Sequence, residues 1–88
     1  MDKDIEDLYF ILEHLSKNDI VKFLIKMNSV DLSQIEDRNE ILKYIEVIIN
    51  YIKICDKFKF DDLKQQLKDL KIKMINNLNN RIYPIDPN

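Results

Sequence analysis

The chain has 88 residues, of which 45% are hydrophobic, and carries a formal net charge of −2 with no glycine or tryptophan. This length predicts one small domain, and the acidic balance argues against a dedicated nucleic-acid binder, because such proteins usually carry a basic excess. The absence of glycine excludes phosphate-binding loops, dinucleotide fingerprints and nucleophile elbows, since each needs a backbone conformation that only glycine adopts cheaply.

The first apolar pattern starts near the N-terminus and repeats at intervals of three and four residues, at Ile5, Leu8, Leu12 and Leu15. Such intervals place side chains on one face of an α-helix. Acidic residues crowd the first turns, where negative charge is favourable beside the helix dipole. Ser16 follows the pattern directly, so we expect it to be the N-cap of a second helix.

The second predicted helix has four inward-facing apolar residues, Ile20, Phe23, Leu24 and Met27. The segment that follows, 28–34, is rich in serine, asparagine and aspartate, which favour caps and turns over helix interiors. It can hold at most a short helix. Two helices are therefore expected in the first 28 residues, and Leu12, Leu15, Ile20 and Phe23 are expected to face inward and seal the corner between them.

The longest apolar segment, 37–55, predicts a central helix. Polar residues recur along it at intervals of three and four, which leaves a narrow solvated stripe on a helix covered from several sides. Its expected inward face comprises Ile41, Leu42, Ile45, Ile48, Ile49 and Ile52.

Residues 56–60 are expected to connect this helix to the last one, with Asp61 as the cap. The last helix has an apolar face made of Leu63, Leu67, Leu70, Met74 and Leu78. Two prolines prevent the final residues from being helical. The prediction is an all-α bundle of five or six short helices in one domain, residues 1–80, followed by an irregular tail, 81–88.

The residue types needed for catalysis and metal binding are scarce. His14 is the only histidine and Cys55 the only cysteine, so a zinc site built from these ligands cannot be assembled. We expect Cys55 to be a buried thiol, and we expect no enzyme activity, cofactor or metal. No apolar run is long enough for a membrane span and no signal peptide is visible, which favours a cytoplasmic location.

A more specific indication comes from residues 12–23, Leu-Glu-His-Leu-Ser-Lys-Asn-Asp-Ile-Val-Lys-Phe. This string resembles the signature at which helix 1 meets helix 2 in pyrin domains of the death-fold superfamily. Segments 32–38 and 60–67 resemble, more loosely, the family's fourth and last helices, although the Pro-Arg-Gly turn before helix 4 is missing. The resemblance implies a Greek-key arrangement of the helices.

The resemblance also implies a charged assembly surface, because pyrin domains form filaments by pairing an acidic face on helices 1 and 4 with a basic face on helices 2 and 3. The matching acidic residues are Glu6, Glu13, Glu36, Asp37 and Glu40, and the matching basic residues are Lys22 and Lys26. Val21 stands where the family commonly has another lysine, so the basic face is thinner than the acidic one. A stand-alone domain with one good face is expected to act as a pyrin-only decoy.

Such a decoy would bind a host pyrin- or death-fold-domain adaptor or sensor and block inflammasome-type filament assembly. Stand-alone domains of this kind occur in poxviruses, and a composition rich in Ile, Lys and Asn fits an AT-rich viral genome. Three other interpretations of the function remain open: a death-effector-type apoptosis regulator, a helical module of the transcription-elongation-factor type, and a small helical immunity or anti-defence protein. Neither a nucleic acid nor a membrane is expected as a partner, and self-association is left open.

Overall fold

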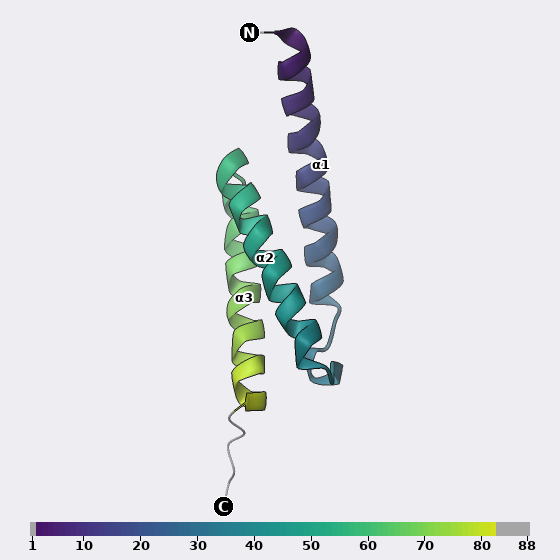
Figure 1. The fold of residues 1–88 in the computed structure, drawn as a ribbon, viewed down its shortest axis with the longest axis vertical. Helices are drawn as coiled ribbons and strands as arrows, with labels where there is room; N and C mark the ends of the chain where they lie inside the picture. Colours follow the sequence, from purple (N-terminus) through teal and green to yellow (C-terminus); the bar gives the residue numbers. More distant parts are fainter. Residues whose placement is uncertain (1, 83–88) are drawn as a thin grey trace, which may run out of the picture.

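The computed structural model describes residues 2–82 and contains three long helices (Figure 1). In chain order the elements are α1 (Lys3–Asn28), the short 3-10 helix η1 (Leu32–Gln34), α2 (Arg38–Phe58) and α3 (Asp61–Ile82). No strand occurs among these residues, so the all-α prediction is confirmed. The expectation of five to six helices in a Greek-key bundle is wrong, because α1 alone spans both of the first two predicted helices.

The predicted corner at Ser16 does not form, and α1 continues through it for 26 residues. No glycine or proline interrupts this stretch, and a serine inside a helix costs at most about 0.7 kcal/mol relative to alanine. Once a helix is nucleated, each added residue gains a hydrogen bond, so propagation outweighs that cost. The N-cap of α1 is instead Asp2, whose side chain accepts a hydrogen bond from the Asp4 N–H at 3.1 Å.

The connection from α1 to α2 contains the short helix allowed by the sequence. Asp31 caps η1 through hydrogen bonds from the Ser33 N–H at 3.0 Å and the Ser33 hydroxyl at 2.7 Å. Asp37 then caps α2 by accepting from the Asn39 N–H at 2.9 Å. The predicted central helix is thus confirmed, and it ends three residues later than expected, at Phe58.

The turn between α2 and α3 is shorter than predicted. Lys59 adopts the left-handed conformation, with φ 60° and ψ 42°, and ends α2 in the role that glycine often has. Helix α3 begins directly at Asp61, so Asp61 lies in its first turn and the prediction that it is the cap is wrong. The carbonyl of Phe60 accepts a hydrogen bond from the Lys64 N–H at 2.9 Å. An ion pair between Lys64 and Asp56 joins the two helices beside the turn.

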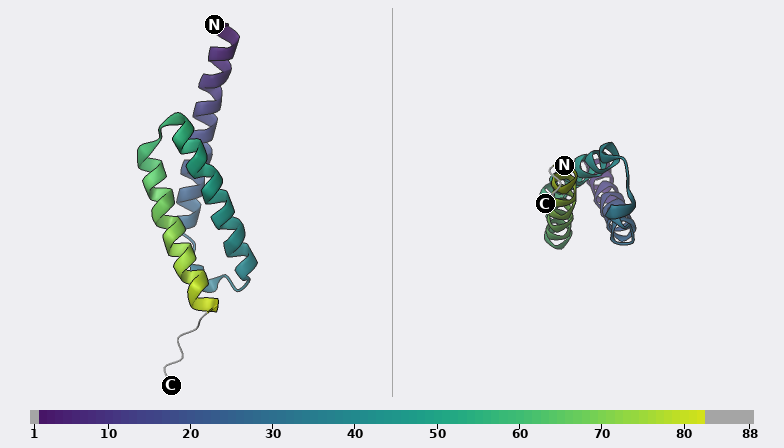
Figure 2. Two further views of the ribbon diagram at one scale, coloured as in Figure 1. Left: turned by 60° about the vertical axis from the view of Figure 1, so that its left-hand side comes forward. Right: turned by 90° about the horizontal axis from the view of Figure 1, so that it is seen from below.

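The core lies where the second half of α1 packs against the α2–α3 hairpin (Figure 2). At the far end of the hairpin, the Arg81 guanidinium donates to the carbonyl oxygens of Leu32 at 2.8 Å and Glu36 at 3.1 Å. These bonds join the end of α3 to the segment around η1. The buried side chains are Ile20, Leu24, Met27, Leu32, Ile41, Ile45, Ile48, Cys55, Leu67, Leu70, Met74 and Leu78.

Several predicted inward faces are only partly buried. Leu42 and Ile49 of α2 remain 46% and 41% exposed, because the neighbouring helices cover a narrower face than the sequence pattern suggests. The inward face of α3 is confirmed, with Leu63 partly buried at its start. Helix α3 continues to Ile82, past the predicted domain boundary at residue 80, and residues 83–88 of the predicted tail lie outside the described residues.

Candidate functional site

The first half of α1 extends beyond the α2–α3 turn (Figure 1). This half exposes a row of aliphatic side chains. Ile5, Leu8 and Leu15 are each 56% exposed, and Leu12 is 43% exposed. We call these four residues the α1 stripe. The stripe was predicted to face inward, and Leu12 and Leu15 were predicted to seal a corner with Ile20; both predictions are wrong, since only Ile20 is buried.

The stripe is exposed because α1 turns a different face to the hairpin. Ile20, Leu24 and Met27 define the buried face, and at 100° per residue the stripe lies about a quarter of a turn away from it. The sequence contained a sign of this rotation: the step from Leu15 to Ile20 is five residues, where an unbroken helical face needs three or four.

The α2–α3 turn contacts α1 beside the stripe and contributes aromatic and basic groups. The rings of Tyr9 and Phe58 meet edge to face, with centroids 5.2 Å apart. The Lys57 ammonium lies 5.9 Å from the Tyr9 ring, and the Lys17 ammonium lies 5.8 Å from the Phe60 ring. The first turns of α1 contain Asp4 and Glu6, so the end of the stripe at Ile5 is acidic.

Two of the charged residues predicted from the resemblance come together around Tyr44. The Lys26 ammonium lies 6.0 Å from the Tyr44 ring, and the Tyr44 hydroxyl donates to Glu40 Oε1 at 3.2 Å. Burial raises the pKa of Tyr44, and the hydrogen bond to the Glu40 carboxylate raises it further. This cluster joins the second half of α1 to the start of α2.

The remaining predicted residues do not form one surface. Glu6 and Glu13 lie on the first half of α1, whereas Glu36 and Asp37 lie near the start of α2. Along the helix axis, Glu6 is about 33 Å from the end of α1, and Asp37 is engaged as the N-cap of α2. The predicted acidic residues are therefore divided between the two ends of the molecule. Lys22 is exposed on the second half of α1.

The side chains considered for catalysis and metal binding lie apart from one another. No group of three or more metal-binding side chains occurs within residues 2–82. His14 packs against Phe10 on the surface of α1, with ring centroids 4.3 Å apart, while Cys55 is buried in the core. Burial raises the pKa of the Cys55 thiol, and the Asp56 carboxylate raises it further. A neutral, enclosed thiol is a poor nucleophile.

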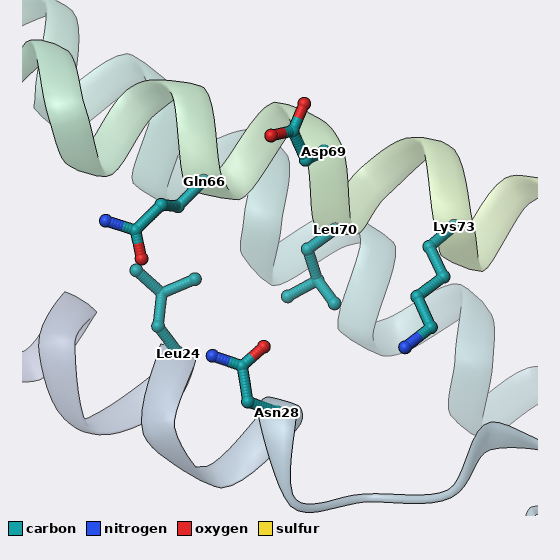
Figure 3. Close-up of a pocket in the computed structure, with 6 residues that line it drawn as sticks. All are labelled: Leu24, Asn28, Gln66, Asp69, Leu70 and Lys73. Atoms are coloured by element: carbon teal, nitrogen blue, oxygen red, sulfur yellow. The ribbon is translucent and has the colours of Figure 1, made fainter.

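A hollow of about 270 Å³ lies between α1 and α3 and is lined by Leu24, Asn28, Gln66, Asp69, Leu70 and Lys73 (Figure 3). In Figure 3 the Gln66, Leu70 and Lys73 side chains point toward α1, whereas Asp69 points away and accepts a hydrogen bond from Gln65 at 3.0 Å. This hollow is open to solvent, as are larger hollows of about 350 Å³ beside the α2–α3 turn, 370 Å³ beside η1 and 440 Å³ at the start of α2. Small-molecule sites, in contrast, enclose most of their ligand. The α1 stripe is the stronger candidate.

In the part of the chain that the structure describes, no helix combines the length and the apolar character required to cross a membrane. The chain matches no protein-family model, and comparisons with curated proteins and with solved structures also find no match. The candidate site therefore stands on the geometry of residues 2–82 alone.

Proposed function

We propose that this chain is a non-enzymatic protein-interaction module that binds its partner through the α1 stripe. The observation that carries the proposal is the exposure of Ile5, Leu8, Leu12 and Leu15 on a helix that projects past the rest of the bundle. Single exposed apolar side chains are common on protein surfaces, whereas contiguous apolar patches mark interaction sites. Ile11, which is 51% exposed, widens the patch.

The form of the stripe favours a helical partner or an apolar groove. Its intervals of three, four and three residues are those of the seam of a coiled coil, in which side chains at such positions insert between the side chains of a facing helix. The α1 stripe belongs to a folded helix, which Tyr9 anchors to the hairpin. Binding through a preformed helix avoids much of the entropy cost of ordering a segment.

The pyrin-domain adaptor or sensor implied by the sequence resemblance stays a prediction. Helix α1 runs uninterrupted through Ser16, so the corner on which that resemblance rests is absent. The proposal accordingly names the binding surface, and a pyrin-domain adaptor is one candidate partner for the test below.

The test compares the tagged chain with two double variants in extract of the cells that produce it. One variant alters the stripe, Leu8→Lys with Leu12→Lys. The control, Ile25→Lys with Ile72→Lys, alters side chains that are 65% and 56% exposed away from the stripe. Circular dichroism is used first to check that all three chains are folded.

Proteins that the wild type and the control recover, but the stripe variant does not, are then purified individually. A pyrin-domain adaptor is purified in the same way as one further candidate partner. Isothermal titration calorimetry measures their binding to the three chains. We expect at least a tenfold weaker affinity for the stripe variant and an unchanged affinity for the control. Equal recovery and equal affinity with all three chains would contradict the proposal.

A further inference from the structure

We propose that the partner seated on the α1 stripe is the stripe of a second copy of this chain, in antiparallel orientation. This inference rests on the proposed function, since it assigns an occupant to the same surface. Three observations support it: the spacing of the apolar residues, the distribution of charge along α1, and the apolar area left open.

The spacing of the stripe is the same from either end. Its intervals are three, four and three residues, so an antiparallel pair of α1 helices places Ile5 of each copy opposite Leu15 of the other and Leu8 opposite Leu12. A twofold interface requires this kind of self-complementary patch. The next position of the seam is Asp19, so the apolar contact has the same limited length in both copies.

The charge distribution favours the antiparallel orientation over the parallel one. A parallel pair would place the acidic first turns of both helices, including Asp4 and Glu6, side by side. The antiparallel pair separates these like charges. Because the juxtaposition of like charges is unfavourable, the acidic first turns disfavour the parallel pair.

The open apolar area is sufficient for a small dimer interface. Exposures of 43% to 56% are found for the five large side chains on this side of the projecting half, Ile5, Leu8, Ile11, Leu12 and Leu15. Each leaves on the order of 100 Å² of surface open. The patch therefore exposes about 500 Å² per partner, or about 1,000 Å² in a symmetric pair, which is the lower limit for a specific interface.

The first test is the molar mass of the purified chain, measured by sedimentation equilibrium from micromolar to millimolar concentrations. We expect a dimer for the wild type and for Ile72→Lys, and a monomer for Leu8→Lys. Leu8 and Ile72 are both 56% exposed, so the two substitutions are matched. Leu8→Ala is a milder second variant, for which we expect at least a tenfold weaker dimer.

The second test establishes orientation by cysteine cross-linking under mild oxidation. We expect a mixture of Ile5→Cys and Leu15→Cys chains to form a disulfide-linked heterodimer. The Ile5→Cys chain alone is expected to remain largely uncoupled. The wild type is the control for Cys55, which is buried.

Each alternative outcome overturns the inference. A folded wild type that stays monomeric at every concentration removes the second copy as the occupant, as does a dimer that survives both Leu8 substitutions. Coupling of Ile5→Cys with itself would show a parallel pair. None of these results decides the proposed function, which is tested separately by binding of other proteins to the stripe.

Discussion

The rings of Tyr9 and Phe58 pack edge to face with their centroids 5.2 Å apart, and this contact joins the first half of α1 to the α2–α3 turn. Phe58 in turn stacks on Phe60 at 5.6 Å. The aromatic group orients α1 so that Tyr9 faces the hairpin while the α1 stripe remains exposed. The cluster of Tyr9, Phe58 and Phe60 therefore fixes the direction of the projecting half of α1 relative to the hairpin.

Removing the Tyr9 ring should loosen the first half of α1. An aromatic pair contributes about 0.5–1.5 kcal/mol beyond its buried area, so we expect Tyr9→Ala to lower the free energy of unfolding by at least that amount. Hydrogen exchange should accelerate in the first half of α1 and change little in α3. The control is Phe10→Ala, whose ring is 61% exposed and packs on His14. Equal effects of both substitutions would contradict the anchoring role of Tyr9.

Ser16→Ala distinguishes a continuous helix from a corner. Because Ser16 lies inside α1, alanine should raise the free energy of unfolding by about 0.5 kcal/mol through its higher helix propensity. If Ser16 were an N-cap, the same substitution would lower that free energy by about 1 kcal/mol. Urea unfolding followed by circular dichroism measures the difference, and its sign decides between the two structures.

Adjacent isoleucines in α2 should differ strongly in their contributions to stability. Ile48 is fully buried and Ile49 is 41% exposed. Ile48→Ala removes packed atoms and leaves a cavity, so we expect a loss of about 2–5 kcal/mol. The loss for Ile49→Ala should be clearly smaller. Chemical denaturation of both variants tests this order, and similar losses would mean that the register of α2 differs from the one described.

The cap of η1 should make stability depend on acidic pH. Hydrogen bonds from the Ser33 hydroxyl and backbone lower the pKa of Asp31 below its usual value of 3.8. A carboxyl group whose pKa is lower in the folded state stabilises that state above its unfolded pKa, and this contribution is lost as the pH falls through the folded value. The difference in melting temperature between wild type and Asp31→Ala should therefore shrink below pH 3.8. A difference that stayed constant between pH 2 and 6 would contradict this linkage.

The Cys55 thiol should be protected from reagents in the folded chain. It is fully buried, and desolvation raises its pKa, so both access and thiolate formation are suppressed. We expect Ellman's reagent to label it slowly at pH 8 in buffer and rapidly in 6 M guanidinium chloride. A double variant, Ile72→Cys with Cys55→Ala, carries an exposed thiol and should react quickly in both conditions. Fast labelling of the folded wild type would show that Cys55 is accessible.

Local features of the helices can be predicted from the order of the residues. The periodicity of residues 37–55 predicts α2, the spacing from Leu63 to Leu78 predicts the buried face of α3, and Asp37 predicts where α2 begins; the structure confirms all three. These features depend on neighbouring residues and backbone chemistry. They can therefore be predicted from the sequence without knowledge of the packing between helices.

What covers each apolar face depends on how the three helices pack together. A repeat at intervals of three and four residues shows that one side of a helix is apolar, but the same repeat at Ile5 to Leu15 and at Leu67 to Leu78 leads to exposure in one helix and burial in the other. The difference arises because α2 and α3 turn back beside Tyr9. Likewise, Ser16 can cap a helix or continue one, and the continuity of α1 is decided by cooperative helix propagation together with the packing of its second half.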